Sequence, residues 1–372
     1  MEDKTEEEEA RFEGWGLALE SAVLAVLARR FGNIERAYSV LQARAWEAQD
    51  MREVQAITDR AAKSIGEDAE RAYSALSAYM TEDAAAFYEA AGKVQGNVLK
   101  PMDTAKAAAW DTIRGLCQTD VMRVVAPDGK RKPIREAYRA IADAGISSVR
   151  DGKPNFQELR KAVETLSRGG VSVEYASGAT RELYSALSMN VIDGYRNAMA
   201  ETRDNQAKEF GADGWEVSSH SLCAPDHLPY QGRQYSFEEM ERIQRKLKRP
   251  IGKGYNCRHR LTKVKLGVSS SKTKKELEAI KDESLREVEW VDVGGARKRG
   301  TVYEFSQAQR RVEQRIRKLR MQSQLAEEAG YTDAARQLRG LSRQAVSLYN
   351  AQSKRCKVAT RPDRYRVYSL KK

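Results

Sequence analysis

The sequence SSHSLCAPDHLPYQG occupies residues 218–232, and GYNCRHR occupies residues 254–260. All three histidines of the 372-residue chain, His220, His227 and His259, lie in these two segments, together with two of its four cysteines, Cys223 and Cys257. Imidazole and thiol groups bind metals and transfer protons near neutral pH. Because the chain concentrates all its imidazole here, we interpret the two segments as one site.

Turn-forming residues predict how these segments meet. Two prolines and a glycine in residues 220–232 predict a loop held by turns. Ser236 and Glu239 have the spacing of a capping box, so a short helix follows, and Pro250 ends it. Two loops that flank one short helix can bring the histidines and cysteines together.

A structural metal site is the first of three interpretations, with Zn²⁺ as the candidate ion. The expected ligands are His220, His227, Cys257 and His259, and Cys223 is a spare ligand.

Two other interpretations stay open. In the second, no metal is bound, and the imidazoles and Asn256 form hydrogen bonds to loop backbone that would otherwise be buried unpaired. In the third, the site is a metal-dependent nuclease or other phosphodiester enzyme that uses His227 and His259. The spacing between Asn256 and His259 is too short for the His-Asn-His nuclease motif.

Basic residues crowd the helix between the loops and its flanks. From Arg242 to Lys265 there are ten Lys or Arg residues and no acidic residue, in a chain of net charge +12. Such density is typical of surfaces that contact phosphates, although a solvated basic helix has the same composition. The candidates for contact with nucleic acid or an acidic surface are Arg242, Arg245, Lys246, Lys248, Arg249 and Lys253.

The rest of the chain predicts a mainly α protein. Residues 1–120 show apolar residues at three- and four-residue steps, typical of a helical bundle or arm, with Gly66 expected to end one helix. Residues 121–270 are expected to form a small α+β domain with a hairpin, a long helix and the His/Cys loop cluster. Residues 271–372 predict a β-hairpin, a helical hairpin whose second helix is capped by Thr332, and a basic tail.

Composition also predicts where the protein resides. Four cysteines do not suggest a disulfide framework, and the first residues are acidic, unlike a signal peptide. The apolar run Leu17–Ala28 is interrupted by Glu20 and is too short to span a bilayer. We therefore expect synthesis in a cytoplasm and no membrane partner.

The order of several short motifs resembles the phage minor capsid proteins, a head-morphogenesis family related to the Mu gpF type. The resemblance covers roughly Val171 to Tyr368, and the first third is similar only in being helical. The motifs are Ser177-Gly178 before a long helix (Arg181 to Phe210), Ser218 to His220, Pro225 to His227, Gln231-Gly232, Asn256 to His259 and Tyr303 to Lys318. Ala224 replaces a common arginine and Cys223 is not a usual family residue, which favours His220 as the fourth ligand.

The resemblance implies a structural virion component of a tailed phage rather than an enzyme. Such a minor capsid protein is made in the host cytoplasm and resides in the head interior or at the portal vertex. Its expected partners are the portal protein and the major capsid protein, and DNA is a further candidate partner. Its expected role is in head assembly, with genome packaging or ejection as further expectations, and no catalytic residue is assigned.

Overall fold

The computed structural model describes residues 2–31, 40–90, 100–150, 156–209, 211–252, 257, 259–267 and 272–366. It is 65% helical with small antiparallel sheets, which confirms the predicted mainly α fold with a small α+β part. The division into three regions at residues 120 and 270 stays a prediction.

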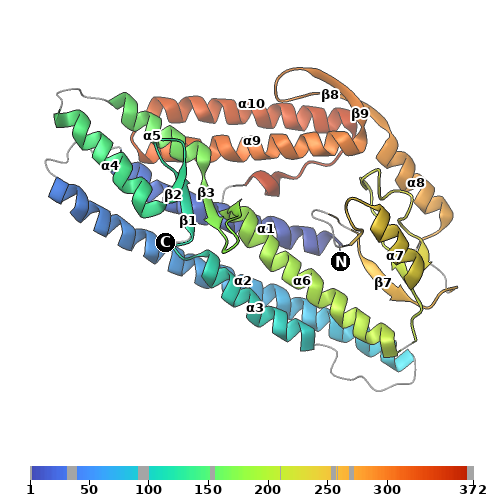
Figure 1. Ribbon diagram of the computed structural model, residues 1–372. Helices are drawn as coiled ribbons and strands as arrows, with labels where there is room; N and C mark the ends of the chain where they lie inside the picture. Colours follow the sequence, from blue (N-terminus) through green and yellow to red (C-terminus); the bar gives the residue numbers. More distant parts are fainter. Residues whose placement is uncertain are drawn as a thin grey trace.

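Long helices form the body of the molecule (Figure 1). Helix α6 packs against both α1 and α3, and α2 packs against the same two helices. Helices α4 and α5 follow the first hairpin. Their bounds are α1 Glu2–Phe31, α2 Val40–Ala90, α3 Lys100–Leu116, α4 Ile134–Arg150, α5 Phe156–Gly169 and α6 Leu183–Glu209.

A four-stranded antiparallel sheet of order β2-β1-β3-β4 packs against these helices. The predicted hairpin after residue 121 is confirmed as its β1–β2 pair, and the predicted long helix follows β4 as α6. The strands are β1 Met122–Val125, β2 Arg131–Pro133, β3 Val171–Glu174 and β4 Thr180–Glu182.

Helix α1 lies at the centre of the main core. Every residue from Leu17 to Ala28 is buried except Ala22, which is half-buried. The same core takes in side chains from α2 to α6, the four-stranded sheet and Met321 and Leu325 of α9 (Val302–Glu328). No helix among the described residues has the length and apolar character needed to cross a membrane.

The prediction that Gly66 ends a helix is wrong. Helix α2 continues through Gly66 to Ala90. A Cβ atom at this position would lie 2.2 Å from a ring carbon of Trp110 in α3. Gly66 therefore permits two helices to approach closely, and tertiary packing outweighs its low helix propensity.

A smaller α+β unit carries the His/Cys loops. Its sheet has the order β6-β5-β7, and α7 packs against β5 and β6. The predicted capping box is confirmed, because Ser236 Oγ accepts from the amide of Glu239 and the Glu239 carboxylate accepts from the amide of Ser236. The elements are β5 Gly214–Val217, β6 Gln234–Ser236, α7 Phe237–Lys246 and β7 Leu261–Val264.

The C-terminal part confirms the predicted β-hairpin and helix pair. Helix α8 precedes the β8–β9 hairpin, and α9 and α10 lie antiparallel along the body (Figure 1). The prediction that Thr332 caps α10 is wrong, because Thr332 is the first helical residue and Tyr331 is the N-cap without a side-chain hydrogen bond. The remaining elements are α8 Lys274–Leu285, β8 Glu287–Val291, β9 Arg297–Thr301, α10 Thr332–Cys356 and the 3-10 helix η2 Pro362–Tyr365.

Candidate functional site

Strand pairing brings the two His/Cys loops to one edge of the small sheet. The first loop (residues 218–233) follows β5, and the second loop (described at residues 247–252, 257, 259 and 260) precedes β7, which pairs with β5 through Val217 and Leu261. The Ser218 amide donates to the Arg260 carbonyl at 2.9 Å, and the Arg260 amide donates to Ser218 Oγ at 2.8 Å. The loops are therefore joined at their base.

Leu222 attaches the first loop to the C-terminal part of the chain. Its φ is +60°, in the left-handed region that non-glycine residues rarely adopt. Its side chain packs against a second core cluster that includes Trp290 and Phe305. This apolar contact holds the strained backbone in place, and Cys223 follows it directly.

The imidazole of His259 lies at the centre of the cluster and is buried. Its Nδ1 atom is 3.5 Å from Cys257 Sγ, and its Nε2 atom is 3.4 Å from Cys223 Sγ. Two groups of ligand atoms each lie within 4.8 Å of one another: His227, Cys257 and His259 form one, and His220, Cys223 and His259 form the other. The structure thus brings three of the four expected ligands together in the first group. The fourth, His220, belongs to the second group, with Cys223.

His227 connects the two loops. Its Nε2 atom is 2.8 Å from the carbonyl oxygen of Arg249, and its Nδ1 atom is 3.6 Å from Cys257 Sγ. The Arg249 guanidinium donates to Asp226 Oδ1 at 2.7 Å. Main chain and side chain of Arg249 therefore both bind the first loop.

Burial and hydrogen bonding set the protonation of the cluster. Burial, with the neighbouring histidines, lowers the pKa of His259 to about 3, and burial raises the pKa of Cys223 to about 12. Burial alone would raise the pKa of Cys257, but hydrogen bonds with His227 and backbone amides outweigh it and lower this pKa. The hydrogen bond with Cys257 raises the pKa of His227 against the opposing effect of burial. Cys257 is therefore the thiol of this cluster that most readily becomes a thiolate.

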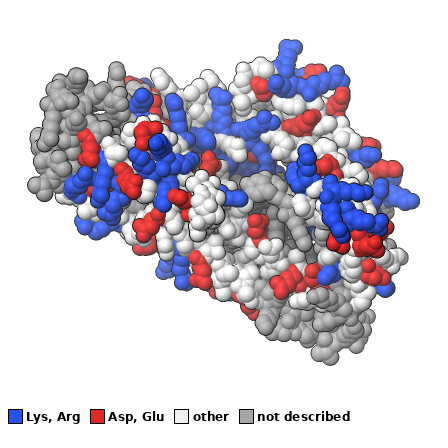
Figure 2. All heavy atoms as spheres, in the orientation of Figure 1, with Lys and Arg blue, Asp and Glu red and all other residues white. Residues whose placement is uncertain are grey.

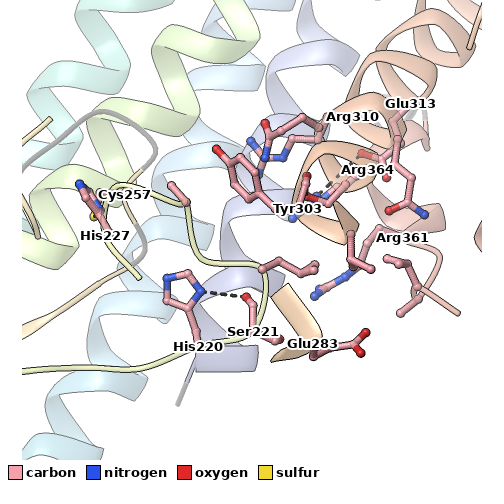
Figure 3. A pocket seen from close by; sticks show the side chains of 18 of the residues that line it. His220, Ser221, His227, Cys257, Glu283, Tyr303, Arg310, Glu313, Arg361 and Arg364 are labelled. Atoms are coloured by element: carbon pink, nitrogen blue, oxygen red, sulfur yellow. Dashed lines mark hydrogen bonds and ion pairs between the residues drawn. The ribbon is translucent and has the colours of Figure 1, made fainter. Parts of the chain in front are cut away.

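A cavity of about 470 Å³ adjoins the cluster (Figure 3). His220, His227, Cys257 and His259 lie on its wall, opposite side chains of α9, of the segment after α10 and Glu283 of α8. Several of these side chains are basic, and Glu313 lies 3.8 Å from Arg364. The basic residues lining the cavity are Arg249, Arg310, Lys357, Arg361 and Arg364.

Sequence reasoning did not predict this second wall. The sequence predicts a basic tail at the end of residues 271–372, but nothing in its spacing connects Arg361 or Arg364 to histidines more than one hundred residues earlier. Gln231, noted only as part of a motif, accepts a hydrogen bond from the His220 amide through Oε1 and faces His259 with the same atom. A convergence of this kind depends on the packing of α9 and α10.

The predicted basic contact residues lie on and after α7, and Figure 2 shows Lys and Arg gathered at that end of the molecule. All five that are described, Arg242, Arg245, Lys246, Lys248 and Arg249, are exposed. Arg245 pairs with Glu241 at 2.8 Å, and Arg249 pairs with Asp226 at 2.7 Å. Lys253 and Asn256 lie outside the described residues.

Fold and site thus describe a long helical protein that carries a small α+β unit with a His/Cys cluster. A family model described as phage minor capsid protein 2 matches residues 17–353. The chain belongs to this family, which confirms the resemblance to phage minor capsid proteins and extends it into the first third of the chain. No curated protein and no solved structure matches the sequence of this chain. Membership makes the chain a virion-associated structural protein of a phage capsid.

Proposed function

We propose that this capsid protein is associated with the portal and acts in head assembly, in contact with the portal protein and the major capsid protein. The family match over residues 17–353 carries this proposal, because it covers the helical body as well as the His/Cys unit. A minor capsid protein must contact other virion proteins to enter the particle. The portal vertex or the head interior is the proposed location.

Charge supports a further contact with the packaged genome. The chain carries a net charge of +12, and Arg242, Lys246 and Lys248 make no ion pair within 4.0 Å to a described residue. Unpaired exposed cations are the groups that neutralise phosphates with least competition. We therefore include DNA among the partners and propose a role in packaging or ejection.

Association with the portal can be tested by co-expression. The chain would be co-expressed with the portal protein of the same phage. As a control, it would be co-expressed with the major capsid protein of that phage and no portal protein. Complexes would be separated by sedimentation. We expect co-sedimentation with the portal. Recovery with the capsid shell but not with the portal would overturn portal association while leaving the capsid role intact.

A second candidate function is a metal-dependent phosphodiester enzyme that uses His227 and His259. One observation favours it: both histidines line a cavity whose other wall carries Arg310, Arg361 and Arg364, the residue type that best binds phosphate oxygens. Purified protein would be incubated with plasmid and Mg²⁺, Mn²⁺ or Zn²⁺. Cleavage that is lost in His259→Ala and retained in Cys117→Ser would establish this activity, and the absence of cleavage with every metal would exclude it.

A further inference from the structure

The hydrogen-bond partners of His227 determine which of its nitrogens is free to bind a ligand. A metal binds the neutral form of an imidazole, which has one N–H and one lone pair. The Nε2 atom faces the Arg249 carbonyl oxygen at 2.8 Å, and a carbonyl oxygen only accepts, so Nε2 carries the proton. The lone pair therefore lies on Nδ1, which faces Cys257 Sγ at 3.6 Å.

The same reasoning applies to His259. The backbone amide of His220 donates to Gln231 Oε1, which establishes that this atom is the amide oxygen. The same oxygen lies 3.4 Å from His259 Nε2, so Nε2 carries the proton and donates. The lone pair of His259 is therefore on Nδ1, and it also faces Cys257 Sγ, at 3.5 Å.

Cys223 lies on the other side of this ring and has the partners of a protonated thiol. Its Sγ donates to the Ala224 carbonyl oxygen at 3.3 Å, while Nε2–H of His259 points toward the sulfur at 3.4 Å. A metal on this side would need the Nε2 lone pair that the Gln231 contact excludes. The group of His220, Cys223 and His259 is thus the poorer of the two candidate sites.

Two imidazole lone pairs converge on Cys257, whose thiol has only one proton to donate. The backbone amide of Gly252 also donates to this sulfur at 3.3 Å, as amides do to thiolates. Tetrahedral zinc, with Zn–S of about 2.3 Å and Zn–N of about 2.0–2.1 Å, places sulfur and nitrogen ligands about 3.5 Å apart. The two separations at Cys257, 3.6 and 3.5 Å, agree with that value.

We propose that His227 Nδ1, Cys257 Sγ and His259 Nδ1 bind one Zn²⁺ ion. Thiolate and imidazole ligands favour zinc over Mg²⁺ or Mn²⁺. The Arg249 carbonyl and Gln231 Oε1 orient the two imidazoles from behind, the second-shell arrangement that metal-binding histidines usually have. Since all three ligands line the cavity, a water molecule or another oxygen ligand reaches the fourth coordination position from there, and His220 is not required.

Metal analysis of the full chain, purified without chelator, tests this site independently of portal association. We expect about one zinc ion per chain in the wild type. Cys257→Ser and His227→Gln should bind zinc at least about tenfold more weakly in a competition titration. The matched variants Cys223→Ser and His220→Gln should retain the wild-type stoichiometry.

Cobalt substitution gives a second measurement that does not depend on equal folding of the variants. Co²⁺ bound by the wild type and by Cys223→Ser should show thiolate-to-cobalt charge-transfer absorption, which Cys257→Ser should lack. A wild-type protein that neither contains nor takes up stoichiometric zinc would overturn the site, in favour of a metal-free network. Loss of zinc in Cys223→Ser or His220→Gln would overturn the ligand set.

Discussion

The Oε1 atom of the Glu20 carboxyl group in α1 accepts a hydrogen bond of 2.9 Å from the backbone amide of Val171 at the start of β3. This bond joins the central helix to the four-stranded sheet across 151 residues of sequence. Glu20 is buried, and Glu182, Arg131 and Arg317 are its charged neighbours. Burial raises the pKa of Glu20 to about 8.

This pKa predicts a loss of stability as pH rises. The folded state holds a proton on Glu20 up to a pH of about 8, whereas the unfolded state releases it near pH 4.5. Between these values the free energy of unfolding falls with increasing pH, by at most about 1.4 kcal/mol per pH unit from this group. Glu20→Gln removes this titration, so the stability of the variant relative to wild type should increase from pH 5 to pH 8.

Chemical denaturation at several pH values measures this effect. Glu241→Gln, which removes an exposed carboxyl group, is the control, and its comparison with Glu20→Gln isolates the effect of burial. If the free energy of unfolding changed with pH in the same way for Glu20→Gln and the wild type, Glu20 would already be ionised in the folded protein.

The hydroxyl of Tyr349 joins three segments of the C-terminal part. It donates to Glu313 Oε1 in α9 and accepts from the backbone amide of Arg361, both at 2.8 Å. Tyr349→Phe leaves both partners without this bond, and we expect a loss of about 1–3 kcal/mol in the free energy of unfolding. Tyr230→Phe, which removes a hydroxyl with no hydrogen bond to a described residue, should change stability by less than about 0.5 kcal/mol. Equal effects of the two substitutions would contradict the assigned role of Tyr349.

Gly66 and Gly340 provide a matched pair within long helices. Alanine is favoured over glycine in a helix interior by about 1 kcal/mol. Gly340→Ala in α10 should therefore stabilise the protein, because no atom of a described residue outside that stretch of helix lies within 4 Å of the added Cβ. Gly66→Ala should instead destabilise it by about 1–3 kcal/mol, because the Cβ meets the Trp110 ring. Thermal unfolding of both variants checks the opposite signs, and stabilisation by Gly66→Ala would show that α2 and α3 are not packed through this residue.

Neutralising Arg242 and Lys246 of α7 and the following Lys248, which form no ion pair with a described residue, should weaken DNA binding. The triple variant Arg242→Gln, Lys246→Gln and Lys248→Gln removes three phosphate contacts, so the slope of log affinity against log salt concentration should become shallower by about 2 to 3. The control carries Arg336→Gln, Arg339→Gln and Arg343→Gln on α10, an equal change in net charge. Binding measured by fluorescence anisotropy should distinguish the two. The same slope in both variants would exclude α7 as the DNA-binding surface.

Local sequence was sufficient to predict the elements whose geometry depends on near neighbours. The helix after β4, the β1–β2 and β8–β9 hairpins and the capping box at Ser236 were all confirmed. Each depends on periodicity or on side chains within a few residues, and these are visible in one stretch of chain. The concentration of every histidine in residues 218–260 likewise predicted where to look for a site.

Residues distant in sequence account for what could not be predicted. The low helix propensity of glycine predicts that Gly66 ends a helix. The contact that lets α2 continue is with Trp110, which lies 44 positions away in the sequence. The cavity wall of Arg310, Arg361 and Arg364 depends on α9 and α10 packing beside the His/Cys loops.

The candidate site shows the same limit at the level of single atoms. Composition and spacing predict four ligands, with Cys223 as a spare, but spacing cannot indicate which nitrogen of an imidazole carries the proton. That depends on the Arg249 carbonyl and Gln231 Oε1, which β-sheet pairing and loop packing bring against the two rings. Residue types and their order therefore predicted a capsid protein with a His/Cys cluster, while folding selects the atoms that can act together, because hydrogen-bond direction exists only once the chain is packed.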